Sequence, residues 1–164
     1  MSSQAKKKAM RVLKQELEDL QKDPIVTLGV VVGQLKDVFH WQMTMLGPQD
    51  TPYANGLFYL RATFPEDYPK HGPKIKFLNK MYHLNVSDSG DICINTLSEW
   101  KEGTTMAEVL SLIFALFYRQ NPNNPYDNEK ANLFKNNRNK FDANVREYTR
   151  KYANIEADCP QCND

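Results

Sequence analysis

Four short segments separated by turn signals fill the first half of the chain and constrain its fold more than any other feature. The first begins at Val30, and the others span 38–46, 57–64 and 74–78; the second and third are rich in β-branched and aromatic residues, as strands are. Gly47-Pro48 and Asn55-Gly56 are turn signals between the second and third segments. Short sequential strands joined by tight turns predict a four-stranded antiparallel meander.

Helical patterns precede and follow these strands. Near the N-terminus, an amphipathic helix ending at Asp23-Pro24 is predicted from apolar residues at three- and four-residue steps: Met10, Leu13, Leu17 and Leu20. Residues 105–119 are apolar nearly all round, which is typical of a buried helix. In the C-terminal part, Asp127 or Asn128 could cap a helix. The residues expected on one apolar stripe there are Phe134, Phe141, Val145, Tyr148, Tyr152 and Ile155.

This order of elements predicts an α+β fold. It consists of an N-terminal helix, the meander sheet, an ordered loop over 82–100, a buried central helix and C-terminal helices. We expect a single domain over residues 1–158, followed by a short mobile tail over 159–164.

Composition limits the classes of function. With 164 residues and a formal net charge of +1, the chain fits one domain and has no general preference for nucleic acid or anionic membranes. No apolar run is long enough to span a membrane, and the N-terminus lacks the apolar core of a signal peptide. Three cysteines do not make a disulfide framework here, so we expect a reducing compartment, the cytoplasm or the nucleus. We also expect a monomer.

A candidate nucleophile, Cys93, lies eight positions after Asn85, whose amide could stabilise a developing oxyanion. A free thiol has a pKa of about 8.5. No Lys or Arg lies close in sequence to lower it, and Asp91 would oppose ionisation. This disfavours a cysteine protease, which needs a thiol activated by an imidazole. The pattern suits an enzyme that receives an already activated acyl group. The alternatives are a buried free cysteine and an asparagine that bonds its own turn.

The segment from Tyr82 to Asn95 resembles the active-site segment of the ubiquitin-conjugating enzymes, in which His-Pro-Asn precedes a glycine, a hydrophobic residue and the catalytic cysteine. The resemblance extends over about residues 8–153. It also rests on Phe39-His40-Trp41, Gly47-Pro48 with Thr51-Pro52-Tyr53, Phe64-Pro65 with Tyr68-Pro69, Trp100, and the loop Asn121-Pro122-Asn123-Asn124-Pro125.

The resemblance implies a transferase. Cys93 would accept ubiquitin as a thioester from an activating enzyme and pass it to a lysine of a protein substrate, usually with a ligase. This chain would bind no cofactor or metal, because the activating enzyme consumes the ATP. Asn85 would stabilise the oxyanion, a contribution of roughly 3–4 kcal/mol in comparable sites. His83 would be mainly structural, and Tyr82, Leu84 and Asn124 would support the site.

Two residues depart from the family's pattern. Leu84 replaces a proline, which frees the backbone and adds an N–H that needs a partner. We therefore expect Asn85 to be held less firmly and transfer to lysine to be slower. Asn124 stands where many members carry Asp or Ser. It cannot supply negative charge to an incoming lysine, whose pKa starts near 10.4, so we expect greater dependence on a ligase.

Two partner surfaces follow from the resemblance. The basic residues Lys7, Arg11 and Lys14 of the first helix would dock the activating enzyme's acidic domain, chiefly raising the on-rate; the alternative is a solvated helix face. Ligase contacts would come from two loops, the first with Pro69 and Lys70 and the second with Trp100, Lys101 and Glu102. Lys70 stands where several members have a bulky apolar residue, so the cognate ligase is expected to be unusual.

Other readings remain open. The runner-up is a carrier of another ubiquitin-like modifier, because Cys93-Ile94-Asn95 and Asn136-Asn137-Arg138 resemble members dedicated to other modifiers. A weakly active or inactive binding module on the same fold is favoured by Leu84 and Asn124 but opposed by Cys93. A metal or redox protein has no convergent ligand set. Cys159 and Cys162 have the spacing of half a zinc site, and we expect them to be free thiols.

Overall fold

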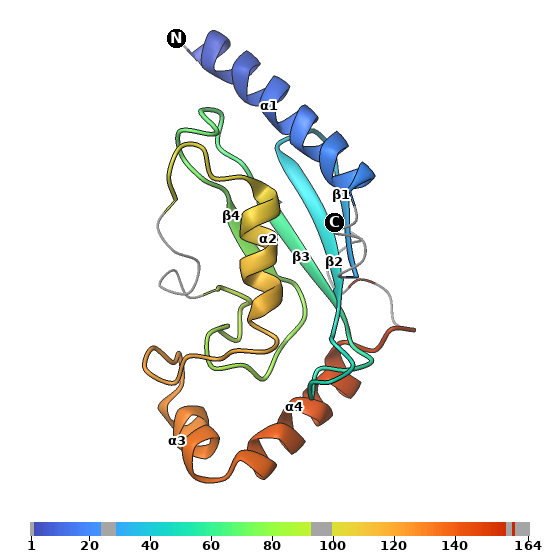
Figure 1. The fold of residues 1–164 in the computed structure, drawn as a ribbon, viewed down its shortest axis with the longest axis vertical. Coiled ribbons are helices and arrows are strands. Elements are labelled where there is room, and N and C mark those ends of the chain that lie inside the picture. The colour runs from blue at the N-terminus through green and yellow to red at the C-terminus, as the bar shows by residue number, and fades with distance from the viewer. Residues whose placement is uncertain (1, 24–28, 93–99, 157–158, 160–164) are drawn as a thin grey trace.

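The computed structural model describes residues 2–23, 29–92, 100–156 and 159 of the chain (Figure 1). Its described part contains four helices and four strands, in the order α1 (Ser2–Lys22), β1 (Val30–Gln34), β2 (His40–Leu46), β3 (Leu57–Thr63), β4 (Lys74–Phe77), α2 (Met106–Ala115), α3 (Asn128–Asn136) and α4 (Arg138–Tyr152). The predicted α+β fold is confirmed.

The four strands form one antiparallel sheet in the order β1-β2-β3-β4, as the meander prediction required. Side chains alternate between the two faces of the sheet, and in β2 and β3 every second residue is buried. Met43 pairs with Leu60, and Trp41 pairs with Ala62, so the buried side chains of the two strands lie side by side. This face and α2 contribute to one hydrophobic core.

Helix α1 lies against β1, and Leu13, Leu17 and Leu20 are buried, as the predicted apolar stripe required. Met10 was expected on the same apolar stripe, but 45% of it is exposed, and Ala9 is buried in its place. Positions 9 and 13 are four residues apart and share a face just as 10 and 13 do, so the sequence pattern admits either residue. The prediction for Met10 is wrong, and its exposure contributes to a surface described below.

Helix α2 begins with a capping box. The N–H of Glu108 donates to Oγ1 of Thr105 at 3.3 Å, and the N–H of Thr105 donates to Oε2 of Glu108 at 3.3 Å. The helix ends at Ala115, short of the predicted residue 119, and Leu112 is 40% exposed. The central helix is therefore buried on one side, not all round as its composition suggested.

The C-terminal helices are separated at Asn137, whose φ of −148° and ψ of 74° interrupt the helical path. Asp127 caps α3, as one of the two expected alternatives, and Asn137 caps α4 by accepting the N–H of Lys140. The predicted single stripe is thus divided between two helices. Ile155 lies beyond α4 and is 55% exposed, so its place on the stripe was predicted wrongly.

The end of α4 is attached to the sheet through Asn79. This buried side chain accepts the N–H of Tyr59 in β3 at 2.7 Å and donates to the carbonyl oxygen of Tyr152 in α4 at 2.9 Å. The N–H of Leu57 also donates to the carbonyl oxygen of Ala153. These bonds fix α4 relative to the β2–β3 hairpin.

Candidate active site

The residue that precedes the predicted nucleophile lies beside the asparagine motif. Ile92 forms an antiparallel bridge with Val86, the residue after Asn85. Both Ile92 and Val86 are buried. Cys93 lies outside the described residues, so its role as nucleophile stays a prediction from the sequence.

The turn between Val86 and Ile92 is closed by its own backbone and is anchored to β4. The N–H of Ser87 donates to the carbonyl oxygen of Asp91 at 2.9 Å, and the N–H of Phe77 donates to that of Gly90 at 2.9 Å. Gly90 has a φ of +90°, and an added Cβ would lie 1.9 Å from the carbonyl oxygen of Phe77. This position therefore requires glycine, which explains the glycine between the asparagine and the cysteine.

Asn85 is fully buried, and both ends of its side-chain amide bond to the loop 121–124. Nδ2 donates to the carbonyl oxygens of Asn121 at 2.9 Å and Asn124 at 3.2 Å, and Oδ1 accepts the N–H of Asn121 at 2.8 Å. The loop thus occupies both N–H groups of the amide. Asn85 holds two segments together, and donation to an oxyanion would require it to share one of these N–H groups.

His83 is buried and bonds only to backbone through its two ring nitrogens. Nε2 lies 2.8 Å from the carbonyl oxygen of Leu116 and must donate to it, while Nδ1 accepts the N–H of Asn85 at 2.9 Å. The ring is therefore neutral. Burial lowers the pKa of His83 to about 4, and the nearby positive charge of Lys130 also lowers it. This geometry fits a side chain that positions Asn85 rather than one that transfers a proton.

Leu84 is fully buried, and the N–H that a proline would lack has a partner. It donates to Oε1 of Gln120 at 2.8 Å, and the carbonyl oxygen of Leu84 accepts the N–H of Tyr126 at 2.9 Å. A buried N–H without a partner would have cost about 1–3 kcal/mol. The structure thus argues against the loosely held Asn85 that the missing proline led us to expect; the rate of transfer to lysine stays a prediction.

The two remaining support residues differ in burial. Tyr82 is half-buried against the rings of Phe141 and Tyr148 in α4, with centroids 5.1 and 5.2 Å away. Asn124 is exposed, and only its backbone carbonyl takes part in the bonds to Asn85 described above. Its side chain therefore stands at the surface beside Asn85, and its effect on an incoming lysine stays a prediction.

These features agree with two comparisons. A sequence model described as ubiquitin-conjugating enzyme matches residues 12–149. The chain belongs to the ubiquitin-conjugating enzyme family. Its structure also resembles the crystal structure of a protein from Plasmodium yoelii that is provisionally named a ubiquitin-conjugating enzyme. The two chains are 34% identical, the match covers 89% of this chain and 96% of the other, and the TM-score is 0.81.

The two loops expected to contact a ligase in this family lie together. Trp100 donates its Nε1–H to the carbonyl oxygen of Pro69 at 2.8 Å, and its ring lies 5.5 Å from that of Tyr68. Lys70, Lys101 and Glu102 are exposed. Trp100 therefore joins the loops from the buried side, which leaves the charged residues at the surface.

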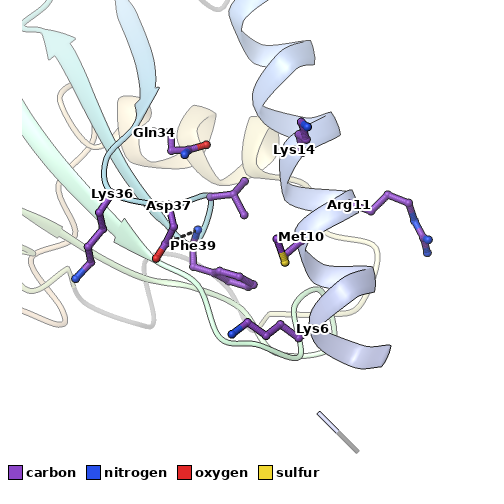
Figure 2. A pocket seen from close by; sticks show the side chains of 9 residues that line it. Lys6, Met10, Arg11, Lys14, Gln34, Lys36, Asp37 and Phe39 are labelled. Carbon is purple, nitrogen blue, oxygen red and sulfur yellow. Dashed lines mark hydrogen bonds between the residues drawn. The ribbon is translucent and has the colours of Figure 1, made fainter. Parts of the chain in front are cut away.

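The exposed side of α1 and the turn after β1 enclose a groove of 680 Å³. Figure 2 shows Lys6 and Met10 of α1 facing Phe39, with Lys36 across from the helix. Arg11 and Lys14 also line the groove, whereas Lys7 is exposed on α1 but is not among its lining residues. The sequence predicted the basic helix face but missed the apolar base formed by Met10, Val38 and Phe39.

Two other expectations concern cysteines and metals. Cys159 is disulfide-bonded in the structure, which contradicts the expectation of a free thiol there. Cys162, its neighbour in the predicted half-site, lies outside the described residues. Among the residues that the structure describes, no cluster of three or more His, Cys, Asp or Glu side chains could hold a metal ion. No described helix is both long and apolar enough to cross a membrane.

Proposed function

We propose that this ubiquitin-conjugating enzyme carries ubiquitin as a thioester on Cys93 and transfers it to a lysine of a protein substrate. The observation that carries the proposal is the family match over residues 12–149 together with the antiparallel bridge between Ile92 and Val86. That bridge brings the residue before Cys93 next to the residue after Asn85. The ATP that drives the cycle is consumed by the activating enzyme, and this chain needs no cofactor of its own.

The transfer step forms one bond and breaks another. The lysine nitrogen attacks the thioester carbonyl carbon, a C–N bond forms and the C–S bond breaks. Cys93 leaves as a thiolate, and the amine loses a proton to solvent or to an acceptor on the substrate or ligase. Asn124 supplies no charge for that proton, which favours an acceptor outside this chain. Asn85 contributes by holding the loop 121–124 and by sharing an N–H with the developing oxyanion.

The test is thioester formation by the full chain. With ATP, an activating enzyme and ubiquitin, wild type is expected to form a thiol-sensitive adduct on non-reducing gels, and Cys93→Ser to form none or a thiol-resistant ester. Replacing both Cys159 and Cys162 by Ser is the matched control and should leave the adduct intact. If wild type forms no adduct with ubiquitin but does with another modifier and its own activating enzyme, the runner-up function is correct. If no modifier is accepted, the binding-module reading leads.

The groove beside α1 is proposed to dock the activating enzyme, whose acidic surface would meet the basic residues of the groove. Arg11→Glu should lower the kcat/KM of thioester formation about tenfold at low ionic strength, and the difference should shrink as salt is added. Lys135→Glu makes the same change in net charge on an exposed part of α3 and is the control. Equal effects of the two variants would contradict docking at this groove.

A further inference from the structure

We infer that Gln120 is a positioning residue that replaces the constraint normally supplied by a proline at position 84, and that it acts on transfer to lysine through Asn85. The inference rests on the proposed function. It is carried by a chain of hydrogen bonds, called here the Gln120 bridge, that runs from Leu84 through Gln120 and Tyr53 to Tyr82. All four residues are buried or half-buried.

The direction of each bond in the Gln120 bridge is determined by chemistry. The N–H of Leu84 can only donate, so Oε1 of Gln120 faces it at 2.8 Å. Nε2 of Gln120 then donates to Oη of Tyr53 at 3.0 Å. The single O–H of Tyr53 donates to the carbonyl oxygen of Tyr82, which can only accept, at 2.7 Å. If the Gln120 amide were flipped, its Nε2–H group would face the backbone N–H of Leu84, donor against donor, so the orientation of Gln120 is unambiguous.

Tyr53 is a firm anchor for this bridge. It is 1% exposed, and its ring lies 5.3 Å from that of Phe117 and 6.0 Å from that of Phe58. Burial raises the pKa of the Tyr53 hydroxyl well above its ordinary value, so the hydroxyl stays protonated and keeps donating. The bridge therefore ties position 84 to a side chain in the core that does not belong to either active-site segment.

The consequence for Asn85 follows from the chain geometry. The peptide group between His83 and Leu84 is held at its N–H by Gln120, and the carbonyl oxygen of Leu84 is held by the N–H of Tyr126 at 2.9 Å. Leucine does not fix φ as proline does, so these two bonds, together with the bond from the N–H of Asn85 to His83, constrain the path that leads into Asn85. Without the Gln120 bond, Asn85 would keep its own partners, but the peptide group between His83 and Leu84 would no longer be held.

A double-mutant experiment separates this role from a general effect on stability. Gln120→Met keeps the volume of the side chain but removes the acceptor. In wild type it should slow single-turnover discharge of preformed thioester to free lysine about tenfold, with thioester formation unchanged. In the Leu84→Pro background there is no N–H to satisfy, so the same change should alter discharge less than about twofold. An equal loss in both backgrounds would overturn the inference.

Amide hydrogen exchange of the protein without a bound modifier gives a second readout that does not depend on activity. The N–H of Leu84 should lose protection in Gln120→Met, and Tyr53→Phe should produce a smaller loss in the same direction. Unchanged protection in both variants would also overturn the inference. If the proposed function is wrong, wild type forms no thioester. If wild type and Gln120→Met both form a thioester and discharge it at the same rate, only this inference is overturned.

Discussion

Acidification is expected to lower the free energy of unfolding by about 3 kcal/mol through His83 alone. The buried ring has a pKa of about 4 in the folded protein, against an ordinary value of 6.5, because burial and Lys130 disfavour its charged form. Between these two values the unfolded chain binds more protons than the folded one, so stability falls as pH falls. The contribution is fully present above pH 6.5 and is lost on the way down to about pH 4. Urea unfolding at a series of pH values between 7 and 4 measures it.

The control for this prediction is His83→Gln. A glutamine offers one donor and one acceptor but does not titrate, so this variant should be less sensitive to acid between pH 6.5 and 4, even if it is less stable at pH 7. A hydrogen bond from His40 lowers the pKa of Asp37 from 3.8, so the contribution of that carboxylate is lost only below this window. An identical pH dependence in wild type and His83→Gln would contradict the prediction.

The sheet could be predicted because its determinants are local. The segment 57–64 is rich in β-branched and aromatic residues and follows a turn signal, and the structure places β3 at Leu57–Thr63. Sequential strands with tight connections pair with their neighbours, so the order of strands followed from the same signals. The predicted end of β3 was one residue too late, at residue 64, whereas pairing with β4 stops at Thr63.

The buried faces of the helices were less predictable because they depend on packing. Met10 and Ala9 both satisfy the helical spacing, and only the packing of α1 in the folded chain determines that Ala9 is buried and Met10 exposed. The apolar residues from Phe134 to Tyr152 gave no sign of the break at Asn137. The rings of Phe134 and Phe141 stay in contact across it, with centroids 5.1 Å apart, so the pattern survives although the helix does not.

The candidate site also has a part that the sequence predicted and a part that only the structure revealed. His83, Leu84 and Asn85 were identified because they lie together in a segment that resembles the family's active-site motif. Apart from the bond between His83 and Asn85, their partners lie more than 30 residues away, between Leu116 and Tyr126, and nothing local points to them. The need for a partner at the Leu84 N–H was foreseen, but any buried acceptor could have met it, so Gln120 emerged only from the structure.

Asn85→Asp is expected to be the most destabilising isosteric change in the site. The aspartate would keep an oxygen for the N–H of Asn121, but its other oxygen would face the carbonyl oxygens of Asn121 and Asn124, to which the amide now donates at 2.9 and 3.2 Å. A buried charge that faces acceptors is left uncompensated. We expect a loss of about 3–5 kcal/mol in the free energy of unfolding at pH 7, measured by urea denaturation.

Asn124→Asp is the matched control for that loss. It makes the same chemical change on an exposed side chain of the loop 121–124 and should alter the free energy of unfolding by no more than about 0.5 kcal/mol. A similar loss in both variants would show that the amide of Asn85 does not hold the loop. If instead only Asn85→Asp is destabilised, the N–H of Asn121 should also lose protection from hydrogen exchange, because the loop that carries it would no longer be held by the two bonds that Nδ2 of Asn85 donates. The asparagine of the family motif would then act in this enzyme first through the loop 121–124, and any help to the oxyanion would depend on that loop being in place.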